Sequence, residues 1–524
     1  MKKLPIGIQS FEDLRSNNYL YVDKTEIIHR MITTGKIYFL SRPRRFGKSL
    51  LLSTLEAIFK GQKELFEGLY IYDQWDWLQY YPVIRIDWTQ INHSTADKME
   101  TSLCRYLYNI ASKYKMTLHS NIASDCFNEL ITSLHEQTNK KVVILIDEYD
   151  KPITSHLFDS QLDVIRQSVH DFYQVMKGAD EYIQFIFLTG VSRFSGLSVF
   201  SALNNLNDIT LHDQFVSICG YTQDELESNF SDYIDTTAEH LKMTKEYLLE
   251  RIRYWYNGYT WDGKTSIYNP FSTLMFFYSK YFNDYWFNTG TPTFLIDTIQ
   301  RHNRTETMLE PFVVDSAMFR GYNPPDIDEV PLLFQTGYLT IKHLELFDGI
   351  PRYTLGVPNS EVNKAFLTCL LRAYGKYPGY RIDNLRMTME RQITNCDEAG
   401  FANSLEVMIA AVPYELHRTD EAYYHTMMLI WMRLLGFEVH GETPNNRGRS
   451  DAVWEQSGVT VIAEIKYHAK KRINTLLKEA MKPIHERRYY NKYSGRVILL
   501  GIAFSRQNVG CKMEELNYKP LCQQ

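Results

Sequence analysis

The residues best suited to chemistry lie in one stretch, 36–52, where an apolar segment meets a basic loop and then an apolar helix. Gly47-Lys48-Ser49 begins that helix, as in a phosphate cradle: Gly47 lets the backbone approach a phosphate, and the helix N-terminus supplies free N–H groups. Lys48 would reach the β- and γ-phosphates of a nucleotide, and the Ser49 hydroxyl would ligate Mg²⁺. The motif asks for Gly at position 42, where this chain has Arg42. An ordinary strand–turn–helix with a basic tip is the alternative.

Two carboxylates stand where a second buried segment ends. Residues 142–146 are five consecutive apolar β-formers, which indicate a strand buried on both faces of a parallel sheet, and Asp147 and Glu148 follow directly. In open α/β sheets, ligands bind outside the carboxyl ends of the strands. Asp147 would hold Mg²⁺ through water, and Glu148 would polarise the attacking water. A strand ending in Asp-Glu can also be a solvated corner, but the Gly-Lys-Ser sequence upstream favours a nucleoside triphosphatase.

A third apolar segment, 182–188, ends at Thr189 and leads to Arg193. Thr189 could sense the γ-phosphate, and Arg193 could meet its charge, either within the chain or in a neighbouring subunit. A capped strand and a surface arginine are the alternatives. Three such strands alternating with helices predict a doubly wound parallel α/β domain over residues 1–215.

A second set of chemical groups lies near the C-terminus. If the turn dipeptide Ser-Gly at 457–458 forms a two-residue loop, Asp451 lies opposite Glu464, and Glu464 and Lys466 share one face. Two opposed carboxylates repel unless a cation lies between them, and Mg²⁺ takes one or two carboxylates together with water and phosphate oxygens. Lys466 would orient or deprotonate the attacking water and stabilise charge on phosphorus. The pattern indicates metal-dependent phosphodiester cleavage; a charged, exposed ribbon is the alternative.

The flanking segments add charge around this hairpin. Glu421 is a candidate further metal ligand, and His425, one helical turn along, is expected to be packed or solvated. Residues 466–492 hold nine Lys and Arg against two Glu, with Tyr489 and Tyr490 between them. Such a basic segment in a net acidic chain predicts salt-dependent contact with a phosphate backbone. A solvated helix face is the alternative.

Length and composition limit the number of domains and the class of protein. The chain of 524 residues is long enough for about three domains, and its 44% hydrophobic and 23% charged residues are ordinary for a globular protein. A net charge of −5 predicts no general attraction to nucleic acid, so basic surfaces must be local. Seven dispersed Cys without a Cys-x-x-Cys pair favour reduced thiols, and no apolar run approaches membrane-spanning length. We therefore expect a cytoplasmic protein without a membrane partner.

The middle of the chain, residues 216–405, is predicted to be mostly helical. Thr222 and Glu225 form a capping-box pattern at its start. Between 332 and 357, a helix followed by two strands around the turn Asp348-Gly349 predicts a winged-helix module. Such a module could bind DNA or serve only as a lid on the N-terminal domain.

With these stretches located, the chain resembles bacterial AAA-ATPase-like proteins fused to a nuclease domain of the PD-(D/E)xK type. The resemblance covers nearly the full length and rests on motifs that occur in order: Tyr21-Val-Asp-Lys-Thr25, Arg42-Pro-Arg-Arg-Phe-Gly-Lys-Ser49, Ile146-Asp-Glu-Tyr-Asp150, Thr189-Gly-Val-Ser-Arg-Phe194, Tyr268-Asn-Pro-Phe271, Thr336-Gly-Tyr-Leu-Thr340, Val357-Pro-Asn359, Gly448-Arg-Ser-Asp451 and Glu464-Ile-Lys466. Arg42 belongs to the family's own loop, so it is not a lesion peculiar to this chain, and the resemblance places Arg45 in the expected nucleotide site. Two positions depart from the family: Ser450 replaces the Pro of the nuclease name, and Pro483 replaces a Gln. Pro483 would break the helix after Lys466 and weaken cleavage.

The resemblance implies a P-loop ATPase-like domain (1–215), a helical and winged-helix lid region (216–405) and a C-terminal α/β domain with a restriction-endonuclease-like fold (406–524). It implies ATP and Mg²⁺ as cofactors and nucleic acid as partner, with DNA favoured over RNA and homo-oligomerisation left open. The expected activity is ATP hydrolysis coupled to metal-dependent cleavage of DNA or RNA. The alternatives are an ATP-dependent signalling or assembly switch whose nuclease-like domain binds without cleaving, and an interaction protein with both sites silent.

Overall fold

The computed structural model describes residues 1–157, 159–193, 203, 205–286, 311–320, 329–365, 380–410, 421–434, 437, 439–445, 448–456, 458–493, 495–505 and 508–518. The described chain divides into two compact units, one up to Asn363 and one from Lys364 onwards. Each unit is considered by itself. Among the described helices, none combines the length and the apolar character needed to cross a bilayer.

The first unit is built on the parallel sheet that the apolar segments predict. Its strands are β1 (Ile37–Ser41), β2 (Val83–Asp87), β3 (Val142–Asp147), β4 (Ile183–Gly190) and the two-residue β5 (Asn207–Asp208), in the order β2-β3-β4-β1-β5. Every residue of β1 and β3 is buried, as the uninterrupted apolar runs require. The register pairs Ser41 with Gly190 and Asp87 with Asp147, so the polar ends of the strands lie along one edge of the sheet.

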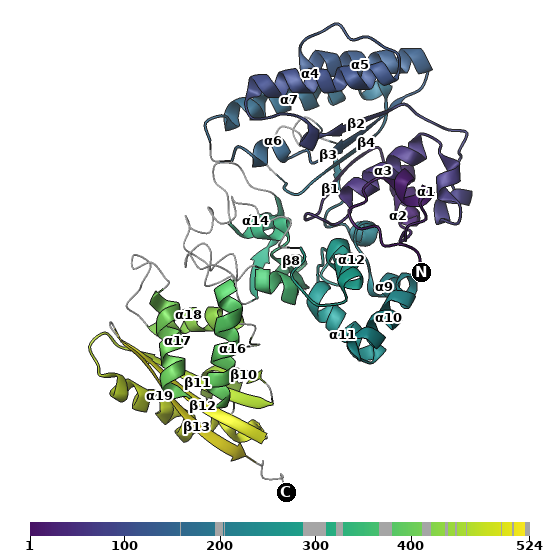
Figure 1. Ribbon diagram of the computed structural model, residues 1–524. Coiled ribbons are helices and arrows are strands. Elements are labelled where there is room, and N and C mark those ends of the chain that lie inside the picture. The colour runs from purple at the N-terminus through teal and green to yellow at the C-terminus, as the bar shows by residue number, and fades with distance from the viewer. Residues whose placement is uncertain are drawn as a thin grey trace. The chain divides into compact units, whose positions relative to one another are not determined.

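Helices cover both faces of this sheet (Figure 1). On one side lie α4 (Ala96–Lys113), α5 (Ala123–Thr138) and α7 (Leu162–Gly178), and on the other lie α1 (Phe11–Ser16), α2 (Thr25–Thr34) and α3 (Lys48–Phe59). The short helix α6 (Lys151–Thr154) follows β3 directly. The predicted doubly wound α/β architecture is therefore confirmed.

Four helices follow the sheet in the chain: α9 (Gln223–Asn229), α10 (Ser231–Leu241), α11 (Lys245–Tyr256) and α12 (Pro270–Ser279). The predicted capping box is present, because Thr222 Oγ1 accepts from Glu225 N–H and Glu225 accepts from Thr222 N–H. The buried ammonium of Lys24 also donates to both oxygens of Glu225, each at 2.6 Å. Burial lowers the pKa of Lys24, while the charge of Glu225 opposes that shift. Glu225 thus joins these helices to the segment before the phosphate loop.

The predicted helix and hairpin are also present in the first unit. Helix α14 (Glu329–Thr336) precedes the antiparallel strands β7 (Thr340–Phe347) and β8 (Ile350–Gly356), and Asp348 and Gly349 between them both have positive φ. That conformation is typical of a two-residue hairpin turn. A third strand, β6 (Phe312–Asp315), pairs with β8 and was not predicted, and the short helix η8 (Ser316–Arg320) follows it. We call α14, η8 and this three-stranded sheet the winged region.

The second unit contains a five-stranded mixed sheet in the order β13-β12-β11-β10-β9. Its strands are β9 (His440–Asn445), β10 (Gly448–Gln456), β11 (Val459–Tyr467), β12 (Gly495–Phe504) and β13 (Val509–Tyr518), and its helices are α16 (Tyr380–Thr394), α17 (Glu398–Ala410), α18 (Glu421–Leu434) and α19 (Ile473–Arg487). Strands β11 and β12 are parallel, and the other pairs are antiparallel. Helix α18 stacks Tyr424 on Tyr467, whereas α19 packs against Ile462, so these two helices lie on opposite faces.

The expectation that Pro483 breaks the helix after Lys466 is wrong. Helix α19 runs through Pro483 to Arg487. Proline removes one backbone donor, but the buried side chains of Leu476, Ala480, Met481 and Ile484 hold the helix on the sheet. Tertiary packing therefore outweighs the local preference.

Candidate functional site: two phosphate-handling centres

The predicted phosphate loop joins β1 to α3 in the first unit. Gly47 is the residue before the helix and has a φ of +92°, and nothing lies within 4 Å of the place where a Cβ would stand. Its left-handed backbone explains the need for glycine, and the open space lets a ligand approach the helix N-terminus. Arg45 also has positive φ, and its guanidinium lies over the ring of Phe271 at 5.0 Å.

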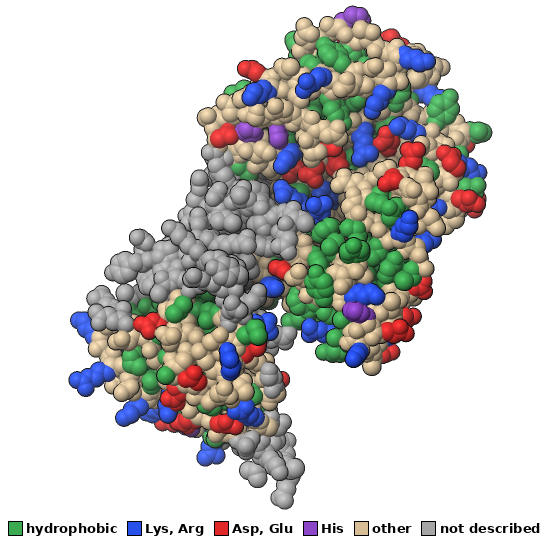
Figure 2. Space-filling view, in the orientation of Figure 1, with side chains coloured by type: hydrophobic (Ala, Val, Ile, Leu, Met, Phe, Trp, Pro, Cys, Tyr) green, Lys and Arg blue, Asp and Glu red, His purple; other side chains and the backbone are tan. Residues whose placement is uncertain are grey.

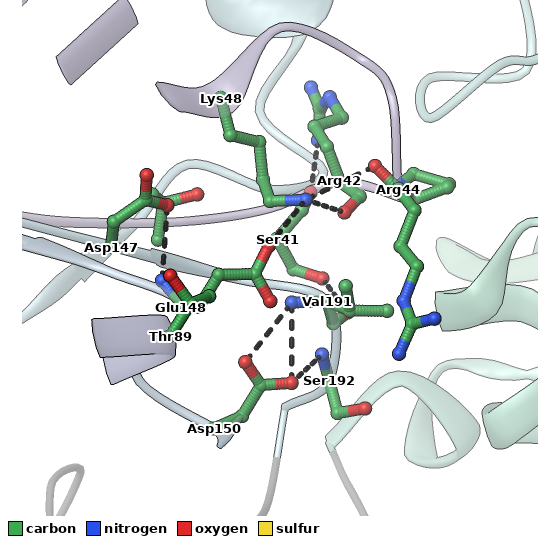
Figure 3. A network of polar contacts seen from close by, with 12 residues as sticks. Ser41, Arg42, Arg44, Lys48, Thr89, Asp147, Glu148, Asp150, Val191 and Ser192 are labelled. Atoms are coloured by element: carbon green, nitrogen blue, oxygen red, sulfur yellow. Dashed lines mark hydrogen bonds and ion pairs between the residues drawn. The ribbon is translucent and has the colours of Figure 1, made fainter. Parts of the chain in front are cut away.

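Lys48 lies buried beneath this loop. Its ammonium donates to the carbonyl oxygens of Arg42 and Pro43 at 3.1 and 3.2 Å and lies 3.7 Å from Glu148 Oε1 (Figure 3). The ammonium therefore already sits where phosphates would be held, with two carbonyls and one carboxylate as its partners. A nucleotide would take the place of those partners.

Asp147 and Ser49 meet beside the lysine, as a Mg²⁺ site requires. Burial raises the pKa of Asp147, while a hydrogen bond from Ser49 and the charge of Lys48 act in the opposite direction. Asp147 Oδ1 also accepts from Glu148 N–H at 3.0 Å. Glu148 has a φ of +52°, a strained backbone for a residue with a side chain, and such strain is concentrated at functional sites. The hydroxyl, the carboxylate and the cation thus fit a nucleotide with Mg²⁺.

Thr189 and Arg193 both lie at the end of β4, and their predicted roles stay predictions. The buried Thr189 hydroxyl donates to the Leu40 carbonyl at 2.8 Å. Arg193 lies 3.1 Å from Asp208 through Nε and donates to the Phe319 carbonyl at 3.0 Å. Arg193 therefore joins the sheet edge to the winged region within the chain.

Arg42 takes a role that spacing alone did not indicate. Its fully buried guanidinium donates to the carbonyls of Ser41 and Thr210 at 2.8 and 2.9 Å and lies 3.9 Å from the ring centre of Trp261. Burial lowers its pKa to about 10. In place of the usual glycine, this loop has a side chain that anchors it to the segment after β5 and to the middle of the chain.

The tip of the phosphate loop also contacts the rest of the first unit. Trp286 Nε1 donates to the Arg44 carbonyl at 3.2 Å. Gly337, in the link between α14 and β7, packs against Pro43, where a Cβ would stand 2.8 Å from Pro43 Cβ. On the α3 side, a small cavity of about 70 Å³ opens between Gly47 and the segment Ile218–Tyr221. The loop is therefore enclosed by elements that follow it by 170 residues or more in the chain.

The second centre lies on the β10–β11 hairpin. Ala452 pairs with Ala463 and Gln456 with Val459, which confirms the predicted register and sets Asp451 opposite Glu464. Glu464 is only 4% exposed. Burial, followed by the charge of Asp451, raises its pKa to about 8. Asp451 Oδ2 accepts from Ile465 N–H at 2.8 Å, so the backbone of β11 holds that carboxylate in place.

Lys466 and Glu421 form an ion pair beside the carboxylates. Lys466 Nζ donates to Glu421 Oε1 at 2.8 Å, and Tyr467 N–H lies 3.3 Å from Glu421 Oε2. Burial lowers the pKa of Lys466, but the hydrogen bond and charge of Glu421 outweigh it and the pKa is raised. A cationic Lys466 suits charge stabilisation better than proton abstraction. The ligand role of Glu421 stays a prediction, and His425 Nε2 lies 3.0 Å from the Asp451 carbonyl oxygen, as a packed histidine.

The last residue of α19, Arg487, and Tyr489 just after the helix lie beside this centre. A hydrogen bond from Tyr489 lowers the pKa of Glu464, and Arg487 donates to the Tyr489 hydroxyl at 2.9 Å. The aromatic residues within the basic segment were noted from the sequence, but only the fold brings one of them to the carboxylates. Within the described residues, no group of three or more His, Cys, Asp or Glu side chains is placed to hold a metal ion. In proteins, Mg²⁺ is commonly held through one or two carboxylates, with water and phosphate oxygens completing its shell, so the metal-ligand roles of Asp451 and Glu464 stay predictions.

The basic segment is partly neutralised in the fold. Lys471 pairs with Glu479 at 2.7 Å and Lys482 with Glu486 at 3.7 Å. On the face shown in Figure 2, Lys and Arg side chains of the second unit are interspersed with Asp and Glu. The segment therefore presents a mixed surface with a basic excess.

Comparisons with known proteins match the two parts of the chain in which these centres lie. A family model described as "Predicted AAA-ATPase" matches residues 5–200, and one described as "PD-(D/E)XK nuclease superfamily" matches residues 419–514. A relative from Azotobacter chroococcum mcd 1, named as an uncharacterized protein in the vnfD 5' region, is 35% identical over 530 residues. The match covers 98% of this chain and 99% of that relative. The chain belongs to the family of AAA-ATPase-like proteins that carry a C-terminal PD-(D/E)XK nuclease-superfamily domain.

Proposed function

We propose that this protein binds and hydrolyses ATP with Mg²⁺ in its first unit and cleaves nucleic acid, DNA or RNA, with its second. The observation that carries the proposal is the meeting of these side chains at one edge of the sheet: Ser49 hydrogen-bonds Asp147, and the buried ammonium of Lys48 lies 3.7 Å from Glu148. The paired carboxylates of the hairpin give the second activity its support.

In the ATPase centre, each residue acts on a different part of the reaction. Mg²⁺ would supply charge neutralisation of the phosphates, with Ser49 and Asp147 as the residues that hold it. Lys48 would bind the β- and γ-phosphates, and Glu148, released from Lys48, would accept a proton from the attacking water.

In the hairpin centre, the two carboxylates and the lysine divide the work. Asp451 and Glu464 would hold Mg²⁺, which would supply activation of water and neutralisation of phosphate charge. Lys466 would stabilise the charge that develops on the phosphate in the transition state. Because the raised pKa of Glu464 favours its protonated form, metal binding must displace a proton there.

The test is purified full-length protein assayed for ATP hydrolysis and for cleavage of DNA and RNA, with and without ATP and Mg²⁺. Lys48→Ala is expected to remove ATP binding, and Glu148→Gln to keep binding while turnover is lost. Equal ATP affinity of wild type and Lys48→Ala by calorimetry would rule out the P-loop assignment. Nucleic-acid binding without cleavage, retained in Lys466→Ala, would instead support the switch alternative.

A further inference from the structure

Asp150 is a buried carboxylate that has no part in the scheme above. It lies two residues after Glu148 and is 2% exposed. Its Oδ2 accepts from Ser192 N–H at 2.7 Å, and its two oxygens lie 3.3 and 3.4 Å from Val191 N (Figure 3). Every one of these bonds is made to the backbone of the segment that leaves β4.

The neighbouring residues hold the same segment. Tyr149 N–H donates to the Thr189 carbonyl at 3.1 Å, and the Tyr149 hydroxyl donates to the Ser192 carbonyl at 2.8 Å. Gly190 lies so close that a Cβ there would collide with Asp150 Oδ1 and the Tyr149 ring. The turn after β3 and the segment after β4 are therefore fastened together by side-chain bonds and by close backbone approach.

The other end of that segment is held by the winged region. Arg193 N–H donates to Gln335 Oε1 at 2.9 Å, and its guanidinium donates to the Phe319 carbonyl. Gln335 belongs to α14 and Phe319 to η8. Residues 191–193 thus lie between the turn that carries Glu148 and the winged region, with hydrogen bonds to both.

We propose that Asp150 is a positioning residue for ATP hydrolysis, which fixes the turn carrying Glu148 against residues 191–193 and makes that geometry depend on the winged region through Gln335. The proposal rests on the proposed ATPase function. Glu148 needs the restraint because its positive φ is strained, and an unfastened turn would relax. Phosphate binding by Lys48 and Ser49 does not use these bonds, so binding and turnover should separate.

The experiment compares wild type, Asp150→Asn, Gln335→Ala and the double variant by steady-state ATP hydrolysis and by the amount of ATP bound per chain. Asp150→Asn keeps one acceptor oxygen but replaces the other with an amide donor. We expect kcat to fall by about 10-fold to 100-fold, the scale for a slightly misplaced catalytic group. We expect KM for ATP and the bound amount to stay within about threefold of wild type. Gln335→Ala should lower kcat less, and the double variant should fall by less than the product of the two single effects.

A purely structural role of Asp150 would lower the bound amount together with kcat and leave the two substitutions independent. Tyr149→Phe removes only the hydrogen bond from the Tyr149 hydroxyl to the Ser192 carbonyl, and it replaces Asp150→Asn in the experiment if that variant does not fold. It should also lower kcat. An unchanged kcat in whichever of Asp150→Asn and Tyr149→Phe folds would overturn the proposal. Effects on kcat that simply multiply in the double variant would overturn it as well. In both cases ATP hydrolysis by the wild type would leave the proposed function intact. A wild-type chain that binds ATP but never hydrolyses it would overturn both.

Discussion

Asp451→Asn separates a metal-binding hairpin from an inert ribbon through its effect on stability. The folded pKa of Glu464, about 8 against an ordinary 4.5, corresponds to roughly 5 kcal/mol between its two protonation states. Burial is the first cause and the charge of Asp451 the second, so we assign on the order of 2 kcal/mol to Asp451. Asp451→Asn should remove the part of the Glu464 shift that comes from the charge of Asp451.

The sign of the pH dependence follows from the direction of the shift. A carboxyl whose folded pKa is raised contributes stability that is fully present below pH 4.5 and lost as the pH rises through about 8. Asp451→Asn lowers the folded pKa of Glu464, so the variant loses less stability than wild type as the pH rises. The variant should match wild type within about 1 kcal/mol at pH 6 and exceed it by on the order of 2 kcal/mol at pH 9, without metal.

With Mg²⁺ bound, wild type should become more stable than Asp451→Asn. Saturating Mg²⁺, at about 100 times its Kd, should add roughly 2.7 kcal/mol to wild type and nothing to Asp451→Asn, because a ligand stabilises only the state that binds it. At pH 7, binding should release about nine-tenths of a proton, since Glu464 must ionise. Lys466→Ala should keep the Mg²⁺ effect and lose cleavage, because its role lies in the transition state.

The assay is hydrogen exchange of the β11 amides, which reports opening of the second unit, with calorimetry in two buffers to count protons. The measurements need a Lys48→Ala, Asp147→Ala background, so that the first unit takes up no metal. Equal protection of β11 by Mg²⁺ in wild type and Asp451→Asn would refute the metal site and with it the nuclease proposal. No gain in stability of the variant at pH 9 would refute the opposed pairing itself.

Four further changes test other parts of the structure. Reversing residues 470–472 to Glu should flatten the log–log decline of nucleic-acid affinity with salt, because fewer phosphates are neutralised; an unchanged slope in a filter-binding titration would place the surface elsewhere. Glu361→Gln should remove a loss of stability between pH 5 and 8 in urea titrations, since burial raises the pKa of Glu361 to about 8. Gly337→Ala should weaken ATP binding in calorimetry, because its Cβ would press on Pro43 in the phosphate loop; wild-type affinity would show that this contact does not matter. Glu421→Gln should abolish cleavage if Glu421 binds metal, and only reduce it if Glu421 merely pairs with Lys466.

The sequence predicts those parts of the fold whose signals are local. Continuous apolar runs located β1, β3 and β4, and the turn dipeptide at 457–458 was enough to set the hairpin register. The two-residue β5 and the four-residue β6 could not be predicted, because in segments this short the alternation of apolar and polar residues does not distinguish a strand from a loop. Pro483 misled local reasoning, since the packing of α19 on its sheet is not visible in the chain near the proline.

In the candidate site, too, the sequence indicated the residues that form local patterns and missed the contacts between distant residues. Residue types and spacing identified Lys48, Asp147 and Glu148, because a phosphate cradle and a strand end are local patterns. Spacing gave no hint that Arg42 packs on Trp261, more than 200 residues along the chain. Partners so far apart in sequence are set by the tertiary fold, and a single sequence does not reveal them.

The two centres share a feature that bears on how their activities are controlled. In each, the lysine that would meet a phosphate already has a carboxylate partner, Glu148 for Lys48 and Glu421 for Lys466. In the first centre that partner is the proposed base, whose Oε1 lies 3.7 Å from the ammonium. Under the proposed function, a phosphate bound by Lys48 would replace Glu148 as its partner and leave that carboxylate free to act as the base.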